Sequence, residues 1–471
     1  MPWQPLPITG PALRTTDESE LDTRNAYLMD VLVNDLGDTV KRPCLEPWVD
    51  LGTTSGVDGL YWWDEQNVLM AVTNGHTLKV TTANGDFVAM GGVQVPIGNR
   101  VSWDTNGTQL IYSNGGQMVI TTVNGTPVAV SDADAPTQVP YVMIHDQYAI
   151  ATIKDTSTFQ ISEVGELDQW RAQDIFSAES KPDIILAGSV SKDGVFLYGP
   201  RSTEFWINDG VTPFSRVRGL SLDRGIGAAY SLAQWGDERF WLDAKRQPVR
   251  ATLQGVTEID NPYLRDFQAL ISVQDAVGEV MVVDGWPLWV LGFPLANRTF
   301  VYNIKQNDWS EWGQWDTENA VYRRFIGHTY AYAKAWGFHV VGDYRNGMLY
   351  KLTRGVYRDN GEDIVRSVRR TGYITHGTAN MKRANTIRLR LKKGVANVDT
   401  ASPTMMVRWR NKGGAWSALR EVSLGEVGQH EVFAELRNLG MYRARQYEFI
   451  HTDNSDWILA DGQENVDVML H

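Results

Sequence analysis

The segment that decides the fold is TNGHTLKVTTANGDFVAM, from Thr73 to Met90, which returns forty residues later as SNGGQMVITTVNGTPVAV, from Ser113 to Val130. Each copy holds two Asn-Gly pairs and a Thr-Thr pair at the same relative positions. Asn-Gly between apolar segments is the strongest short-range hairpin signal, because both central residues of a type I′ turn need a positive φ. Each copy is therefore predicted to form three strands joined by two type I′ turns.

A period of about forty residues is the length of one four-stranded propeller blade. Apolar strand openers recur at roughly this interval, with one longer step, beginning at Leu60, Val101, Tyr141, Ile184, Ala229, Leu270 and Arg324. We therefore expect an all-β fold with a six- or seven-bladed β-propeller. Two stacked β-sandwiches would also give short, regularly spaced strands, but they do not explain two nearly identical segments at a fixed offset.

The pattern changes after about residue 359. Beyond residue 360 there are 16 Lys and Arg against 13 Asp and Glu, although the chain as a whole is acidic. The stretch IRLRLK, residues 387–392, alternates strictly, which places its apolar side chains on one face of a strand and its basic ones on the other. The predicted division is an extended N-terminal arm over 1–51, a propeller over 52–358 and a C-terminal β-sandwich over 359–471.

Composition restricts the possible functions of the 471-residue chain. Its formal net charge of −12 repels nucleic acid and anionic membranes, which excludes tight, sequence-independent DNA binding as its main task. A single cysteine, Cys44, excludes a disulfide within the chain and a cysteine-based zinc site. We expect no membrane span, because no apolar run approaches 18 residues.

No motif demands catalysis. The glycines form neither a P-loop nor a dinucleotide-binding pattern, and the eight histidines lack metal-ligand spacing. We therefore expect no enzyme, no cofactor, and no catalytic or metal-binding residue. SWDTNGT, from Ser102 to Thr108, resembles the Asp-box turn of sialidases, which is a structural turn and so supports repeated hairpins without indicating activity. The alternative function is a glycan-binding or glycan-cleaving propeller, such as a receptor-binding protein. Cleavage would need a pair of carboxylates across a sugar, or an arginine cluster for an acidic sugar.

Two groups of charged residues are candidates for contacts between copies of the chain. A ring needs two different surfaces of each subunit to match, and complementary charge fixes their register. The alternative is that these side chains form ordinary solvated faces. The candidate residues are the basic Arg366, Arg369, Arg370, Arg388, Arg390 and Lys392 and the acidic Asp132 and Asp134 in SDADAP.

The middle of the chain resembles the packaged-DNA stabilisation proteins of short-tailed bacteriophages, also called tail hub or nozzle proteins. The resemblance lies in DQWRAQDIFSAESKPDIILAGSVSKDGVFLYGPRSTEFWINDG, residues 168–210, and in SLDRGIGAAYSLAQWGDERFWLDA, residues 221–244. Its matching elements are Ala178-Glu179-Ser180 with Pro182-Asp183, then Ser202-Thr203-Glu204, then Gly225-Ile226-Gly227.

This resemblance implies a structural protein of the virion tail. Such proteins form a homohexameric ring below the portal and its adaptor ring, seal and extend the portal channel, retain packaged DNA and conduct it during ejection. The implied partners are other copies of the chain, the adaptor ring, the tail plug or needle, the tailspikes or fibres, and double-stranded DNA passing transiently and without sequence specificity.

Overall fold

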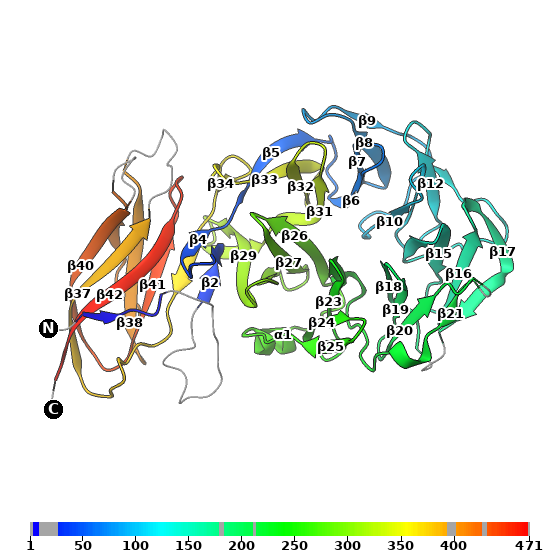
Figure 1. The fold of residues 1–471 in the computed structure, drawn as a ribbon. Helices are drawn as coiled ribbons and strands as arrows, with labels where there is room; N and C mark the ends of the chain where they lie inside the picture. The colour runs from blue at the N-terminus through cyan, green and yellow to red at the C-terminus, as the bar shows by residue number, and fades with distance from the viewer. Residues whose placement is uncertain are drawn as a thin grey trace.

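The computed structural model describes residues 3–8, 27–178, 183–210, 213–392, 402–425 and 431–469. Figure 1 shows a propeller with a β-sandwich beside it at one end of the molecule. The predicted all-β fold, a propeller followed by a C-terminal sandwich, is confirmed. Among the described residues, no helix is long and apolar enough to cross a membrane.

The propeller has seven four-stranded blades in the described chain. Blades 1 and 2 contain β6 (Val57–Trp63), β7 (Val68–Thr73), β8 (His76–Val80), β9 (Phe87–Ala89), β10 (Ser102–Thr105), β11 (Gln109–Ser113), β12 (Val119–Thr122) and β13 (Val128–Ala129). Blades 3 and 4 contain β14 (Val142–His145), β15 (Tyr148–Thr152), β16 (Thr158–Glu163), β17 (Glu166–Ser177), β18 (Ala187–Ser191), β19 (Gly194–Tyr198), β20 (Thr203–Ile207) and β21 (Ser215–Arg216). Blades 5 and 6 contain β22 (Ala233–Trp235), β23 (Glu238–Leu242), β24 (Pro248–Thr252), β25 (Gly255–Glu258), β26 (Val277–Val283), β27 (Trp286–Phe293), β28 (Arg298–Asn303) and β29 (Asp308–Asp316).

The predicted strand openers locate the first three blades well and the later ones less well. The segments at Leu60, Val101 and Tyr141 lie in or beside β6, β10 and β14. The segments predicted at Ile184, Ala229 and Leu270 precede the strands β18, β22 and β26, so these openers are placed too early. Two short helices intervene before these strands, η3 (Ala229–Ser231) before β22 and α1 (Leu264–Ala269) before β26; η2 (Arg218–Leu220) follows β21.

Each repeated segment begins at the last residue of the second strand of its blade and contains the two outer strands, and only one of the four predicted type I′ turns is present. Asn74 and Gly75, with φ of 51° and 74°, close a two-residue turn between β7 and β8. Asn84, Asn114 and Asn124 are not in the positive-φ region. The connections that contain these three residues are longer than two residues, because the pairing of the flanking strands ends further from the Asn-Gly pair. The repeat therefore predicts strand order correctly and turn type poorly.

The forty-residue period also appears as hydrogen bonds between neighbouring blades. The Asp58 carboxylate in blade 1 accepts from the backbone N–H of Gly98, just before blade 2, at 3.0 Å. The Asp104 carboxylate in blade 2 accepts from the N–H of Ile144 in blade 3 at 2.6 Å. Each bond joins residues forty positions apart, so the sequence period matches the step from blade to blade.

Blade 7 is completed by a strand from the beginning of the chain. It contains β31 (Gly327–Ala333), β32 (Phe338–Asp343), β33 (Met348–Thr353) and, at its outer edge, β5 (Cys44–Asp50). β5 pairs antiparallel with β33, with Leu45 opposite Leu352. The two ends of the propeller segment are thereby hydrogen-bonded to each other, which closes the ring of blades.

The sandwich also takes strands from both ends of the chain. Its first sheet holds β3 (Val31–Val33), β4 (Thr39–Lys41), β42 (Ile458–Val468), β37 (Lys382–Lys392) and β40 (Glu431–Tyr442), with β1 (Trp3–Pro5) added to β42. Its second sheet holds β2 (Tyr27–Met29), β36 (Ser367–Arg370), β41 (Arg445–His451), β38 (Thr404–Asn411) and β39 (Arg420–Ser423), and β2 joins it to β29 of blade 6. The described parts of the predicted arm 1–51 thus form strands of both domains. Short strands β30 (Val321–Arg324), β34 (Arg358–Asp359) and β35 (Asp363–Ile364) complete the list.

The predicted alternation in β37 is confirmed. Ile387, Leu389 and Leu391 are at most 2% exposed and belong to the sandwich core. Arg388 and Arg390 lie on the opposite face and are partly exposed. The same core contains side chains of the second sheet, including Val407 and Phe449.

A buried arginine joins the parts of the fold where propeller and sandwich meet. The Arg42 guanidinium donates to Asp30 at 2.7 Å and to Asp359 at 2.5 Å, and its side chain is fully buried. Asp30 also accepts from the N–H of Gly313 in β29, and Asp359 accepts from the N–H of Leu45 in β5, each at 2.9 Å. Burial raises the pKa of Asp30 to about 6, against the opposing effect of Arg42. The cluster therefore fixes blade 6 and the closing strand to the sandwich.

We predict that Arg42→Ala lowers the free energy of unfolding by about 3–5 kcal/mol, because it leaves two carboxylates buried without their partner. Lys305→Ala is the matched control, since Lys305 and Asp35 form a pair with more than half of each side chain exposed; it should cost at most about 1 kcal/mol. Urea unfolding followed by tryptophan fluorescence measures both. Equal effects of the two substitutions would contradict the role given to Arg42.

Candidate functional site

Side chains cross the central channel of the propeller. Arg100 precedes β10, the innermost strand of blade 2. It forms an ion pair with Glu279 on β26 of blade 6 and donates to the backbone carbonyl of His328 on β31 of blade 7 at 3.0 Å. Neither of these blades is a sequential neighbour of blade 2. The contacts therefore span the channel rather than the seam between two blades.

A second contact crosses the channel between blades 3 and 5. The Tyr141 hydroxyl, just before β14, donates to the carbonyl of Ala229 at 2.8 Å. Its ring stacks on that of Tyr230, with the centroids 5.7 Å apart. Together with Arg100, these rings fill the middle of the propeller.

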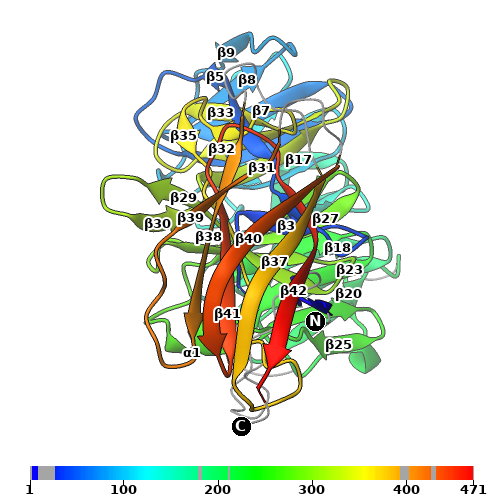
Figure 2. The same cartoon turned by 90° about the vertical axis from the view of Figure 1, so that its left-hand side faces the viewer.

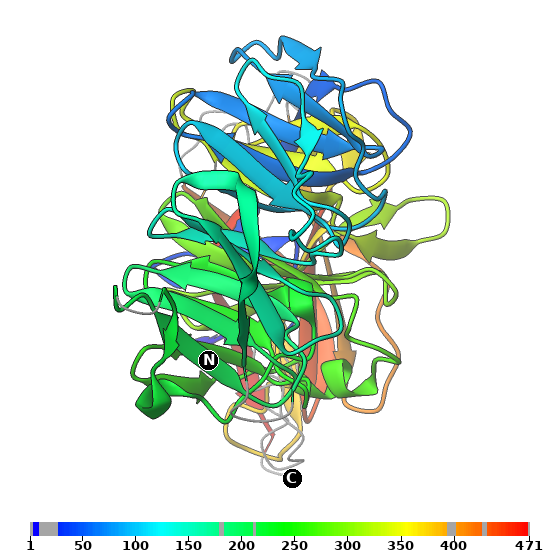
Figure 3. The ribbon, with the colours of Figure 1, turned by 90° about the vertical axis from the view of Figure 1, so that its right-hand side faces the viewer.

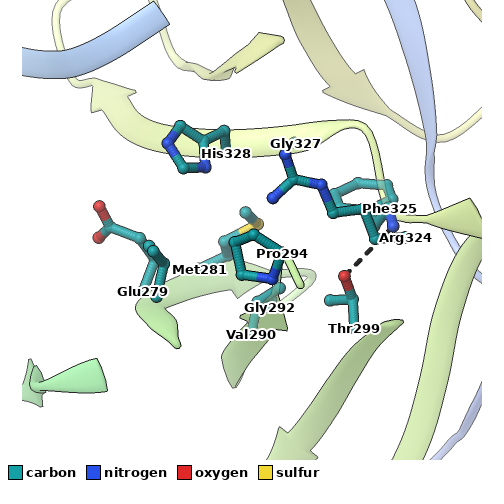
Figure 4. A pocket seen from close by; sticks show the side chains of 11 residues that line it. Glu279, Met281, Val290, Gly292, Pro294, Thr299, Arg324, Phe325, Gly327 and His328 are labelled. Carbon is teal, nitrogen blue, oxygen red and sulfur yellow. Dashed lines mark hydrogen bonds between the residues drawn. The ribbon is translucent and has the colours of Figure 1, made fainter. Parts of the chain in front are cut away.

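A small pocket lies beside these channel-crossing side chains, between blades 6 and 7 (Figure 4). It is lined from β26 by Glu279 and Met281 and from the opposite side by Arg324 and His328, and the Phe325 N–H donates to Thr299 at 3.2 Å on its wall. Its volume of about 20 Å³ holds one water molecule. A substrate does not fit there.

The titratable groups of the described residues form no recognisable catalytic arrangement at this pocket. Burial, together with the nearby positive charges of Arg100 and Arg324, lowers the pKa of His328 to about 3, so the imidazole is neutral at physiological pH. Glu279 is already paired with Arg100. Among the described residues, no group of three or more His, Cys, Asp or Glu could hold a metal ion.

The low pKa of His328 predicts a pH effect on stability. An unfolded chain protonates an ordinary histidine near pH 6.5, whereas the folded protein keeps His328 neutral down to about pH 3, so the unfolded state binds more protons between these values. This group's contribution to the free energy of unfolding is therefore present above pH 6.5 and is lost as the pH falls toward 3.

We predict that His328→Asn makes stability fall less steeply between pH 6 and 4 than it does in the wild type, as measured by urea unfolding at several pH values. Comparing variant with wild type is essential, because burial raises the pKa of Asp58 and of Asp104 to about 6, which acts in the opposite direction. His76→Asn, at an exposed position, is the control for replacing a histidine with asparagine. Parallel curves for wild type and His328→Asn would refute the assignment.

The basic residues predicted on β37 face carboxylates from neighbouring strands. Arg388 lies opposite Glu435 on β40 and forms an ion pair with it at 2.7 Å. Arg390 lies opposite Asp461 on β42. The outer face of this sheet thus mixes both signs of charge. The side chain of Lys392 lies outside the described residues.

The other predicted residues separate into internal and surface positions. Arg369 is 1% exposed, so its charge does not reach the surface of a single copy. The Asp132 carboxylate accepts from the N–H groups of Trp170 and Asp134, and these bonds lower its pKa. Asp134 is exposed. Arg366 and Arg370 are partly exposed and line one pocket.

This pocket, here called the junction pocket, lies where blade 6 meets the second sheet of the sandwich and has a volume of about 540 Å³. Figure 2 shows the β29–β30 hairpin projecting from the propeller beside β38 and β39. The hairpin forms one wall, and β2, β36, β38 and β41 supply the other. Five arginines but only two glutamates line it, namely Arg298, Arg323, Arg366, Arg370 and Arg408 with Glu311 and Glu448.

Most of these arginines already have a carboxylate partner. Arg298 pairs with Glu311 at 2.5 Å, and Arg370 and Arg408 share Glu448, which is 1% exposed. Arg323 pairs at 2.5 Å with Asp316, which does not itself line the pocket.

Arg366 differs from the other arginines of the junction pocket. Its guanidinium lies 4.6 Å from the Trp315 ring centroid and donates to the Tyr322 hydroxyl at 2.8 Å. Within the described part of the chain it has no ion-pair partner. The pocket therefore presents an arginine fork between two aromatic rings, a geometry suited to a carboxylate.

Sequence reasoning identified Arg366 and Arg370 but missed the rest of this pocket. Arg408 alternates with Arg410 in VRWR, as the basic residues do in IRLRLK, so that signal was available. Trp315, Tyr322 and Arg323 carry no such signal, because they belong to blade 6 and its hairpin.

Comparison with known proteins gives one clear result. Residues 48–357 match the family model Phage_stabilise, described as Bacteriophage P22 Gp10, beta-propeller. This range runs from β5 to the end of blade 7. No curated protein matches the chain. Among solved structures, the crystal structure of the computationally designed Ika8 protein is similar to this chain with a TM-score of 0.41 and 12% identity, over 65% of this chain and all of that one.

Proposed function

Because the chain belongs to the Phage_stabilise family and is a structural virion protein of a bacteriophage, we propose that it forms part of the tail hub. In this role it extends and seals the portal channel, retains packaged DNA and conducts it during ejection. Its partners in the proposal are further copies in a hexameric ring, the portal adaptor ring, the tail plug or needle, and the tailspikes or fibres. The resemblance over residues 168–210 and 221–244 supports this assignment within the family.

The match of residues 48–357 to the Phage_stabilise family carries the proposal, and the closed channel of the propeller restricts how the protein could conduct DNA. The major groove of DNA alone is about 12 Å wide, whereas the Arg100–Glu279 pair and the Tyr141–Ala229 bond span the middle of this propeller. A duplex cannot pass through one copy. A conducting role therefore requires several copies arranged around a common passage, which is what a ring provides.

The acidic character of the chain agrees with conduction rather than with DNA binding. Each lysine or arginine contact to a phosphate adds salt-dependent affinity, which would hold a moving duplex. Acidic side chains outnumber basic ones in the chain, with 56 Asp and Glu against 44 Lys and Arg. We propose that the surface facing the passage is neutral or acidic.

The test is a phage that lacks this protein. We predict that its particles package DNA but lose it, so that the encapsidated genome becomes sensitive to added nuclease, and that supplying the protein in trans restores protection. The protein should also be found in purified tails by mass spectrometry. Particles that stay full and nuclease-resistant without it would refute the proposed role.

A further inference from the structure

The junction pocket has a feature to which the proposed ring assigns no role, namely a positive charge that has no ion-pair partner among the described residues. Arg366 is partly buried, held between Trp315 and Tyr322, and unpaired within the described chain. A guanidinium in this setting gains from an incoming carboxylate, because its orientation is already fixed by stacking and by the Tyr322 hydroxyl.

The lining also restricts what the occupant can be. Glu311 and Glu448 are bonded to Arg298, Arg370 and Arg408, so neither is available as a catalytic acid or nucleophile. The remaining free surface is an arginine fork with the rings of Trp315 and Tyr322 around it. An acidic side chain with an apolar neighbour matches this surface.

The chain itself carries such a segment. The β16–β17 turn reads EVGELD, residues 163–168, with acidic side chains on Glu163, Glu166 and Asp168 and with Val164 58% exposed. Gly165 donates its N–H to the carbonyl of Gln147 at 2.9 Å, which fixes the turn against the β14–β15 turn and its exposed Asp146. Arg171 compensates only Glu163, through an ion pair at 2.7 Å.

The two surfaces lie far apart on one copy. Blade 3 is at the end of the molecule opposite the sandwich, as Figure 1 shows, and Figure 3 views the molecule from that end. The turn therefore cannot reach the junction pocket of its own chain. Two unlike, complementary surfaces at opposite ends are what a head-to-tail contact between copies requires.

We propose that the junction pocket of one copy receives the acidic 163–168 turn of the next copy, with Glu166 facing Arg366. This inference rests on the proposed ring. The two can fail separately: absence of the protein from tails contradicts the function, whereas assembled copies that ignore these two surfaces contradict the inference alone.

Thiol cross-linking tests the contact directly. Cys44 is 0% exposed, so introduced cysteines would be the reactive thiols. The full-length double variant Val164→Cys/Ala320→Cys, treated with a short bismaleimide, should give a ladder of covalent trimers and larger species on a denaturing gel. Each single variant can form dimers at most, because one introduced cysteine per chain allows one cross-link, and the proposed contact brings no two of these cysteines together. A double variant whose cross-linked species are no larger than those of the single variants would overturn the proposal.

Charge exchange is the second test, read out by sedimentation of the purified protein at 50 µM in low salt. We expect Arg366→Glu and Glu166→Lys each to weaken self-association at least tenfold, and the double variant Arg366→Glu/Glu166→Lys to recover most of it. Lys334→Glu, in blade 7 and with its side chain 67% exposed, is the matched control and should associate as the wild type does. Thermal unfolding of each variant checks that it is folded.

Three outcomes would overturn the proposal. They are normal association of folded Arg366→Glu, a double variant as weak as the single ones, and a wild type that stays monomeric at this concentration. A monomeric wild type that instead binds N-acetylneuraminic acid, with binding lost in Arg366→Glu, would assign the pocket to an acidic sugar.

Discussion

The buried charge cluster around Arg42 is the constraint on which the rest of the structure depends. Burying three charged groups is costly. Here the cost is offset because Arg42 pairs with both carboxylates, and each carboxylate also accepts from a backbone N–H of a different part of the chain. Asp30 reaches Gly313 in blade 6, and Asp359 reaches Leu45 in the strand that closes blade 7. Ring closure and the position of the sandwich are thus set by one cluster. A rigid junction between the domains follows, and the junction pocket is built on it.

Side chains cross the central channel of this closed propeller, so a DNA duplex cannot pass through a single copy. Arg100 ties blade 2 to blades 6 and 7, and Tyr141 ties blade 3 to the segment before blade 5. These contacts stiffen the wheel and remove the space through which anything large could pass. For a structural virion protein, the useful surfaces are then its ends and edges, where the charged groups lie. The passage for DNA, in the proposed function, is a property of the assembly.

Local sequence patterns predicted local structure, and they failed where distant strands meet. The forty-residue repeat and the alternation of Ile387, Leu389 and Leu391 correctly predicted blades and a sandwich strand, because both depend on residues close in sequence. The type I′ turns at Asn84, Asn114 and Asn124 were wrong, since strand pairing, and not the dipeptide, sets turn length. The basic face of Arg388 could not be judged without Glu435, 47 residues away. The junction pocket was likewise invisible, because Arg366 meets Trp315 only after blade 6 and the sandwich have packed together.

The central claim is that DNA passes along the common passage enclosed by a ring of copies, and never through the channel of a single propeller. Cryo-electron imaging of the intact tail tests it most directly, because it resolves the protein and the duplex together. The account predicts a ring of copies around a single axial passage that holds the DNA density, with the Arg100–Glu279 pair and the Tyr141 contact intact in every propeller. DNA density along the axis of an individual propeller, or a tail without this protein, would contradict it.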